Sequence, residues 1–382
     1  MTSPTPPPAG PGPGPGAGPG PGPGPGLQEM LCPFCLEPVS FDERQLFARD
    51  ERQQYAALDL SRQTSPLRRA DTLRSAYQRC RNTDGVPPHF IPVPYLTHGS
   101  PLTVAMVGDS ATGKTHLLTQ MIAQITEGGL EPYGITWQSV NPQQHEAFIQ
   151  ERVAPLRSGR MLDHTGSTAF ASFVEAVLLT GPDRVTRPVA FFDLGGEDLR
   201  RTDALLRFML GVDALIFVVD PLRALPLPYL DPLRGETNLS HTRGGDPAFQ
   251  TVLDRLPRTG PYHRVAAAVV VNKCDLLRFE PPVDRWLTEP PPARISAALF
   301  REESRDAYAF LRHHAGPAWV RPFDSVLRCT LHFASATGSH DRQGSFVHGT
   351  TPRRVLEPLV SVLSMCGVLG HEGTDGPAAV GM

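Results

Sequence analysis

The segment that most restricts the fold of this chain is Val104 to Thr115, which reads Val-Ala-Met-Val-Gly-Asp-Ser-Ala-Thr-Gly-Lys-Thr. It fits the pattern G-x-x-x-x-G-K-[ST], in which a glycine-rich loop turns its backbone N–H groups toward phosphate oxygens. The apolar run 102–107 predicts a buried strand before the loop, and 115–126 predicts a helix after it. The motif requires this order of strand, loop and helix, so a chance glycine loop is a poor alternative.

The residues of this loop have distinct expected roles. Lys114 reaches the β- and γ-phosphates, Thr115 offers a hydroxyl to Mg²⁺, and the helix N-terminus adds a positive dipole. We expect a nucleotide to contact Gly108, Asp109, Ser110, Ala111, Thr112, Gly113, Lys114 and Thr115.

A second phosphate motif follows the strand predicted over 187–192, where Asp193-Leu-Gly-Gly196 matches D-x-x-G. An aspartate at this position can hold Mg²⁺ directly or through water, and Gly196 lets its N–H approach the γ-phosphate. In isolation the pattern would be an ordinary turn. Its place at a strand end downstream of the phosphate loop favours the metal role.

A third motif, Asn272-Lys-Cys-Asp275, ends the strand predicted over 265–272 and matches N-K-x-D. The carboxylate of Asp275 can accept hydrogen bonds from the ring N–H and the exocyclic amine of guanine, a pattern that adenine does not offer. Lys273 can lie over the base plane, and Asn272 can tie this loop to the phosphate loop. The motif therefore predicts guanine selectivity.

Two smaller observations support a nucleotide site. Ser335 and Ala336 follow the strand predicted over 326–334, where a backbone N–H could meet the guanine oxygen. Of the 36 Lys and Arg residues only Lys114 and Lys273 are lysines, and both lie in nucleotide motifs. A planar guanidinium replaces a compact ammonium poorly at such positions.

The rest of the chain alternates between apolar runs and amphipathic segments, which predicts an α/β fold. A further strand is expected over 211–220, and helices are expected over 44–62, 66–79, 142–153, 168–179, 197–210, 247–256, 296–315 and 357–366.

Near the N-terminus, Cys32-Pro-Phe-Cys35 is a knuckle of the kind that opens zinc ribbons. A second C-x-x-C pair is missing, but Cys80 and His89 could complete a tetrahedral zinc site with the knuckle. Their spacing is irregular, and a metal-free remnant with reduced cysteines is an equal alternative.

Composition excludes several classes of function. A net charge of −3 gives no sign of a nucleic-acid or membrane surface, and no apolar run is long enough to cross a bilayer. The chain begins with a Pro/Gly-rich stretch rather than a secretion signal, and its six scattered cysteines do not suggest a disulfide framework. We therefore expect a cytoplasmic protein with no nucleic-acid partner and no integral membrane segment.

The four motifs stand in the order found in Ras-like (TRAFAC-class) GTPases, and the chain resembles this family over 100–366. The knuckle and the late Phe333-Ala-Ser-Ala-Thr-Gly338 are similar to those of uncharacterised bacterial predicted GTPases of the double-GTPase type. The resemblance implies a P-loop NTPase fold, with a mostly parallel sheet, helices on both faces and ligand at the carboxyl ends of the strands. The remaining parts would be a disordered Pro/Gly tail over 1–26, an N-terminal Cys-containing appendage over 27–99 and a disordered tail over 367–382.

The resemblance also implies catalytic residues. The switch threonine that caps Mg²⁺ would be Thr165 or Thr168, of which Thr165 is preferred. Glu197 stands where many relatives have a glutamine that orients the attacking water, so we expect slow hydrolysis that depends on Glu197 and on at least one cis arginine, with Lys114 as a further catalytic residue. The arginines that flank the switch segments could act in cis, and they are Arg160, Arg200 and Arg201.

Three functions are compatible with the sequence. The leading one is a Mg²⁺-dependent switch that binds GTP and GDP, hydrolyses GTP slowly and acts on protein effectors. The second is a nucleotide-binding pseudo-GTPase that serves as a scaffold, and no sequence feature separates it from the first. The third is an ATPase, against which Asp275 argues.

Overall fold

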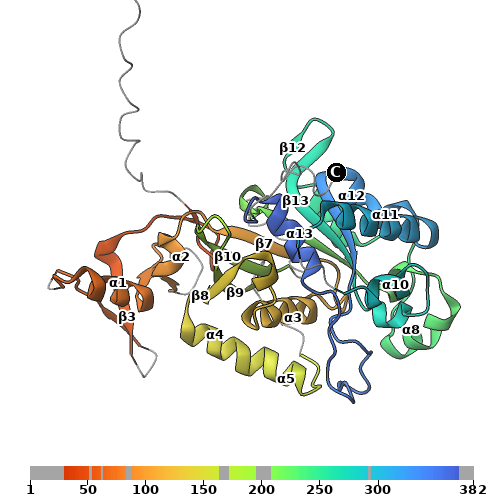
Figure 1. The fold of residues 1–382 in the computed structure, drawn as a ribbon, viewed down its shortest axis with the longest axis horizontal. Coiled ribbons are helices and arrows are strands. Elements are labelled where there is room, and N and C mark those ends of the chain that lie inside the picture. The colour runs from red at the N-terminus through yellow and green to blue at the C-terminus, as the bar shows by residue number, and fades with distance from the viewer. Residues whose placement is uncertain are drawn as a thin grey trace, which may run out of the picture.

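The computed structural model describes residues 30–50, 54–61, 63–82, 88–162, 172–194, 208–290 and 294–369 (Figure 1). Its centre is an eight-stranded mixed sheet accompanied by helices, so the predicted α/β class is confirmed. The strand order is β12-β13-β11-β7-β10-β9-β8, and β14 also pairs with β13. The strands are β7 Leu102–Val107, β8 Thr136–Ser139, β9 Ser172–Thr180, β10 Thr186–Asp193, β11 Ala214–Val219, β12 Arg258–Thr259, β13 Tyr262–Val271 and β14 Val326–Phe333.

The middle of the sheet is parallel. Strands β10, β7, β11, β13 and β14 pair with one another in parallel, whereas β8, β9 and β12 join antiparallel. Parallel strands bring their carboxyl ends to one edge of a sheet, and that edge is where ligands bind in open α/β folds. The motif residues predicted at strand ends therefore meet at this edge.

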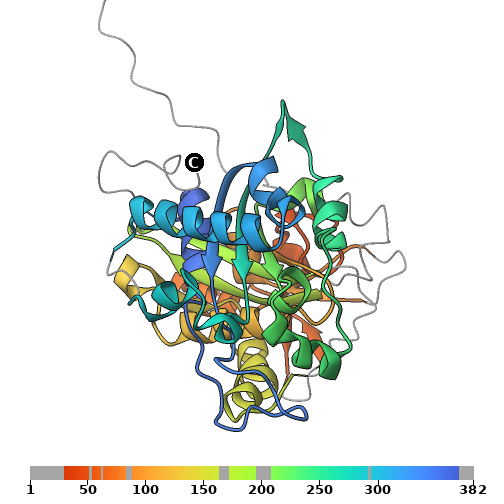
Figure 2. The same cartoon turned by 90° about the vertical axis from the view of Figure 1, so that its right-hand side faces the viewer.

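Each face of the sheet is covered by helices (Figure 2). Along β7, Ala105 and Val107 belong to a core shared with α9, α11 and α12, while Val104 and Met106 belong to a core shared with α3 and α13. This alternation follows from the two-residue period of a strand. The helices are α3 Lys114–Thr126, α4 Pro142–Phe148, α5 Ala154–Arg157, α7 Pro221–Ala224, α8 Asp231–Thr237, α9 Pro247–Leu253, α10 Val283–Thr288, α11 Ala297–His314, α12 Pro317–Ser325 and α13 Glu357–Met365. A π-helix over Ile149–Val153 joins α4 to α5.

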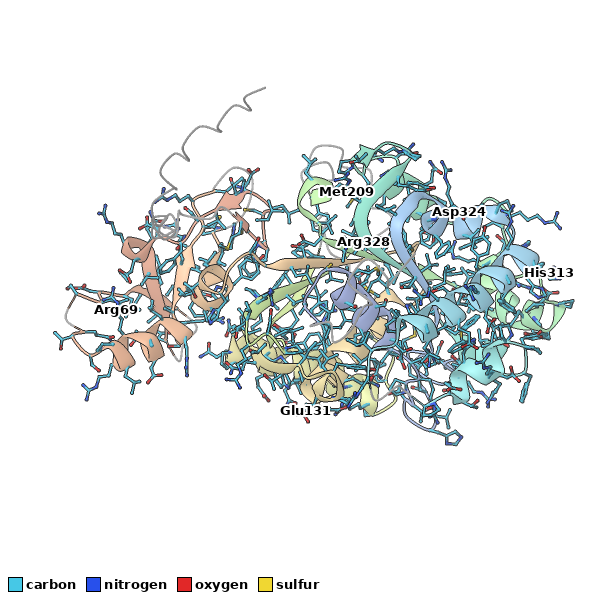
Figure 3. The ribbon with its side chains drawn as sticks, turned by 45° about the horizontal axis from the view of Figure 1, so that its top comes forward. Arg69, Glu131, Met209, His313, Asp324 and Arg328 are labelled. Carbon is cyan, nitrogen blue, oxygen red and sulfur yellow. The ribbon has the colours of Figure 1, made fainter. Side chains whose placement is uncertain are left out.

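The N-terminal part forms a module of its own at one end of the molecule. In Figure 3, Arg69 marks this module and His313 of α11 lies at the opposite end. The module has a four-stranded antiparallel sheet in the order β4-β3-β5-β6, and a separate pair β1-β2. Its elements are β1 Met30–Leu31, β2 Pro38–Val39, β3 Leu46–Arg49, β4 Tyr55–Ala57, α1 Pro66–Ser75, β5 Tyr77–Arg79, β6 Phe90–Pro92 and α2 Val93–Thr97.

The helix predicted over 44–62 is wrong, and so is the end of the one predicted over 66–79. Short strands occupy these stretches, because hydrogen bonding to distant segments decides their structure. The charged residues in the local sequence do not reveal such pairing. Gln78 shows this: its side chain accepts from the Asp42 N–H at 2.7 Å and donates to the Ser40 carbonyl at 2.9 Å.

The helix predicted over 168–179 is also wrong, because β9 occupies Ser172–Thr180. An apolar run of this length fits a strand or a buried helix equally well, and pairing with β8 and β10 decides for the strand. Most of the helix predicted over 197–210, the tail 1–26 and most of the tail 367–382 lie outside the described residues. Within the described ranges, no helix has both the length and the apolar character needed to cross a bilayer.

Candidate functional site

The glycine-rich loop lies between β7 and α3, as its motif requires. Gly113 has φ +85°, and a Cβ there would lie 2.6 Å from the Asn272 side-chain nitrogen, so only glycine fits without displacement. Lys114 is buried, and its ammonium donates to the carbonyls of Gly108 and Asp109 at 2.8 and 2.9 Å. Burial lowers the pKa of Lys114, although nearby aspartates oppose that shift.

Asp193, at the end of β10, accepts a hydrogen bond from the Thr115 hydroxyl at 2.6 Å. Its other carboxylate oxygen, Oδ1, is buried and has no hydrogen-bond partner among the described residues. A buried carboxylate oxygen without a donor is costly unless a cation or water satisfies it. The Thr115 hydroxyl and the Asp193 carboxylate are therefore oxygen ligands of the kind that Mg²⁺ binds, and Oδ1 of Asp193 is available to a cation.

The loop after β13 contacts the glycine-rich loop 108–113 through two side chains. The Asn272 amide donates to the Thr112 carbonyl at 3.1 Å and accepts from the Ala336 N–H at 3.2 Å. The Lys273 ammonium donates to the Ala111 carbonyl at 2.8 Å and pairs with buried Asp220 at 2.7 Å. These contacts bring three of the predicted motifs into one cluster.

Asp275 is one of the residues that line a cavity of about 810 Å³. The Ser335 hydroxyl donates to its carboxylate at 2.6 Å and accepts from the Gly338 N–H at 2.9 Å. Burial raises the pKa of Asp275. The cavity is of a size typical for small-molecule sites, and its other wall comes from α8 and the loop after β14.

Two residues that sequence reasoning missed also touch the phosphate loop. Asp246 caps α9 through the Ala248 N–H at 2.8 Å, and its second oxygen accepts from the Asp109 N–H at 2.9 Å. Arg223 of α7 forms an ion pair with the Asp109 carboxylate at 2.7 Å. A signal was present, since the stretch 221–246 is long for a connection and long connections often carry functional residues.

The predicted catalytic residues are only partly described. Arg160 is exposed, and its backbone forms an isolated bridge with Ser345. The predicted switch and catalytic residues that lie outside the described residues are Thr165, Thr168, Gly196, Glu197, Arg200 and Arg201.

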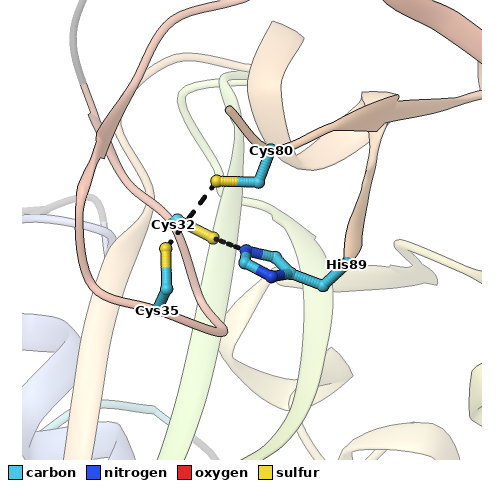
Figure 4. Close-up of side chains that lie close together, drawn as sticks. All are labelled: Cys32, Cys35, Cys80 and His89. Atoms are coloured by element: carbon cyan, nitrogen blue, oxygen red, sulfur yellow. Dashed lines mark hydrogen bonds between the residues drawn. The ribbon is translucent and has the colours of Figure 1, made fainter. Parts of the chain in front are cut away.

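A second site lies in the N-terminal module (Figure 4). The ligand atoms of Cys32, Cys35, Cys80 and His89 all lie within 4.8 Å of one another, so this group could bind a metal such as zinc. Cys32 Sγ is 3.2 Å from His89 Nε2, and the sulfurs of Cys35 and Cys80 are 3.7 Å apart. The predicted grouping of these four residues is thus observed.

The fold explains the irregular spacing of the four ligands. Cys32 and Cys35 lie in the turn between β1 and β2, whereas Cys80 follows β5 and His89 precedes β6. Because β5 and β6 are antiparallel neighbours, Cys80 and His89 meet across the sheet, and the Cys80 N–H donates to the His89 carbonyl at 3.1 Å. The hydrogen bond with Cys32 lowers the pKa of Cys35 to about 4.

No family model matches this sequence, and no curated protein is significantly similar to it.

Proposed function

We propose that this chain is a Ras-like, P-loop GTP-binding protein that hydrolyses GTP slowly and acts as a switch. The observation that carries the proposal is the contact of four distant motifs at one edge of the sheet. Thr115 touches Asp193, Asn272 bridges Thr112 and Ala336, and Ser335 touches Asp275. A phosphate loop, a metal carboxylate and a base-reading carboxylate together match the needs of a purine nucleoside triphosphate.

Guanine is the base that best fits the residues around Asp275. An ionised carboxylate can accept two parallel hydrogen bonds from guanine, and the cavity beside it can hold the base. Adenine presents no such donor pair, so an adenine nucleotide would leave the buried Asp275 carboxylate with its Ser335 hydrogen bond but without those two donors. Leaving a buried polar group without a partner is the strongest basis for discrimination between related ligands.

Mg²⁺ would be held by Thr115 and Asp193, and it would neutralise charge on the β- and γ-phosphates. In the proposed reaction water attacks the γ-phosphorus, the bond to the β-phosphate oxygen breaks, and GDP and inorganic phosphate leave. Lys114 would stabilise the charge that develops on the leaving oxygen. Thr165, Glu197 and Arg160 keep the roles that the resemblance implies, and GTP-dependent binding of protein effectors stays a prediction.

We also propose that the Cys3His group holds one structural zinc. Three sulfurs and one imidazole match a closed tetrahedral zinc site, and all four come from short segments that the ion would tie together. The site leaves no ligand position that a substrate would need, so its role is structural.

The test is calorimetric titration of the full chain with GTP, GDP and ATP in the presence of Mg²⁺. We expect GTP and GDP to bind at least about a hundredfold more tightly than ATP, because only guanine pairs with Asp275. Asp275→Ala should remove the preference, whereas Asp284→Ala, which changes an exposed aspartate on α10, should keep it. Equal affinity of the wild type for GTP and ATP would contradict the proposal. Turnover of bound GTP then separates a hydrolysing switch from a pseudo-GTPase.

A further inference from the structure

The short helix α7 presents an arginine to the phosphate loop. Asp220, the last residue before α7, caps the helix by accepting from the Leu222 N–H at 2.9 Å and also pairs with Lys273. The carbonyl of Arg223 accepts from the Thr242 N–H at 2.9 Å. Both ends of α7 are therefore fixed, and Arg223 is held opposite Asp109 and Ser110 of the phosphate loop.

The guanidinium of Arg223 is only partly used by these contacts. Nη1 pairs with the Asp109 carboxylate at 2.7 Å, and Nη2 donates to the Ser110 carbonyl at a long 3.3 Å. Nε is buried and has no hydrogen-bond partner among the described residues, so the donors that solvent can reach are those of Nη1 and Nη2. A guanidinium carries five N–H donors, and 21% of this side chain is exposed, so donors remain for an anion that enters from solvent.

The contacts of Lys114 indicate where Arg223 lies relative to a bound triphosphate. The Lys114 ammonium donates to the carbonyl of Asp109, whose carboxylate holds Arg223. The two cations therefore flank the same residue of the loop. Since a lysine at this motif position reaches the β- and γ-phosphates, Arg223 lies at the triphosphate end of the site and not at the base.

Charge explains why an arginine is needed here. Asp109 places a carboxylate, 32% exposed, on the loop that must accept a polyanion. Without a neighbouring cation this carboxylate would repel the terminal phosphate. An arginine can satisfy a carboxylate and a phosphate at once, because its planar fork offers separate pairs of donors.

We propose that Arg223 is a phosphate-contacting residue supplied in cis: it is held by Asp109 in the free protein and contacts the terminal phosphate of a bound triphosphate. This inference rests on the proposed function. It gives Arg223 of α7 the role of a cis arginine, which the sequence analysis assigned to Arg160, Arg200 and Arg201. The competing role is a structural one, in which Arg223 only holds the loop in place through Asp109.

The two roles predict different effects for two substitutions. Loss of a phosphate contact weakens the triphosphate more than the diphosphate, because GDP lacks the terminal group. We therefore expect Arg223→Ala to reduce affinity for a non-hydrolysable GTP analogue at least about tenfold more than affinity for GDP, with Arg223→Lys between it and the wild type. Asp109→Asn removes the repelling charge and should raise the preference for the triphosphate several-fold. A residue that only holds the loop would give losses of the same sign and size with both nucleotides.

The experiment is equilibrium titration of the full chain and these variants with GDP and the GTP analogue, with Arg305→Ala, an exposed arginine on α11, as control. Single-turnover hydrolysis adds a second readout, since a cis arginine that contacts the terminal phosphate should raise the rate by tenfold or more. Equal effects of Arg223→Ala on both nucleotides, or no effect, would overturn this inference and leave the proposed function intact. If the wild type binds neither nucleotide, both fail.

Discussion

The ring of Phe34 lies edge-on against the ring of Phe173, with the centroids 5.3 Å apart. Phe34 belongs to the cysteine knuckle and Phe173 to β9, so this contact joins the N-terminal module to the central sheet. Phe173 in turn contacts Phe192 at 5.8 Å, and Phe192 precedes Asp193 on β10. The knuckle also shares one hydrophobic core with the sheet. The candidate metal group is therefore linked by packed side chains to the edge of the sheet that carries Asp193.

Removal of the metal should consequently destabilise the whole protein and not the module alone. We expect Cys35→Ser to lower stability by about 2 kcal/mol or more, because a bound ion stabilises only the folded state. Thermal unfolding with and without a chelator measures this, together with elemental analysis for zinc. Cys366→Ser, outside the metal group, is the matched control. Zinc far below one equivalent, with unchanged stability of Cys35→Ser, would favour the metal-free remnant.

Guanine-nucleotide affinity should fall at acid pH. Burial raises the pKa of Asp275 above its ordinary value, and only the ionised carboxylate accepts two hydrogen bonds from guanine. In the free protein, the free energy of unfolding decreases as pH rises above the ordinary pKa of an aspartate. The reason is that the Asp275 carboxyl loses its proton at a lower pH in the unfolded chain than in the folded protein. Bound guanine has the opposite effect on the pKa of Asp275, because its N–H donors stabilise the ionised carboxylate.

The affinity for GDP should therefore decrease as pH falls toward the raised pKa and should be constant well above it. Calorimetry at a series of pH values measures this. Asp275→Asn, which cannot ionise, should lose most guanine affinity and gain xanthine affinity, because its amide can donate to the exocyclic oxygen of xanthine. A pH profile for GDP that is the same in Asp275→Asn and in the wild type would rule out Asp275 as the source.

The sequence predicted the central sheet better than the appended parts for a physical reason. Continuous apolar runs such as Ala214–Val219 leave few alternatives to a buried parallel strand. Four other strands of the sheet, β7, β10, β13 and β14, end at or next to a motif with its own pattern. Strands such as Tyr77–Arg79 are short, charged and paired with distant segments, so no local pattern marks them. The sequence did not mark Arg223 because the role proposed for it rests on a contact with Asp109, 114 residues away in the sequence.

We expect Asp246 to hold the phosphate loop in its binding conformation for GDP and GTP alike. It accepts from the Asp109 N–H and caps α9, so Asp246→Ala leaves two N–H groups without this acceptor at a cost of about 1–3 kcal/mol. We expect affinity for GDP and for GTP to fall together, unlike the effect of Arg223→Ala. Titration with both nucleotides checks this, and Asp254→Ala, a change just beyond the end of α9, is the control. A selective loss of GTP binding would assign Asp246 to the terminal phosphate instead.

A buried charged network supports the loop that carries Ser335. Glu303 of α11 pairs with His332 at 2.9 Å and with Arg354 at 2.8 Å, and it accepts from the Phe333 N–H at 3.0 Å. The residue next to Arg354, Arg353, forms a backbone bridge with Ser335. Burial alone would raise the pKa of Glu303, but its partners together outweigh burial and lower it. These contacts thus connect the interior of the sheet to the loop that carries Ser335.

Glu303→Gln should cost about 3–5 kcal/mol, because it leaves the buried guanidinium of Arg354 with only the more distant Glu357 carboxylate, 3.7 Å from Nη1. Since the folded pKa of Glu303 is lowered, the wild type keeps this contribution above the ordinary carboxyl value and loses it as pH falls through the lowered value, whereas the variant lacks that dependence. Denaturant unfolding at several pH values measures both effects. Glu302→Gln, a change in the adjacent exposed ion pair, should cost no more than about 1 kcal/mol. Similar losses of unfolding free energy in the two variants would show that the buried contacts of Glu303 stabilise the fold no more than the surface pair does. The network would then not be what holds Ser335 beside Asp275.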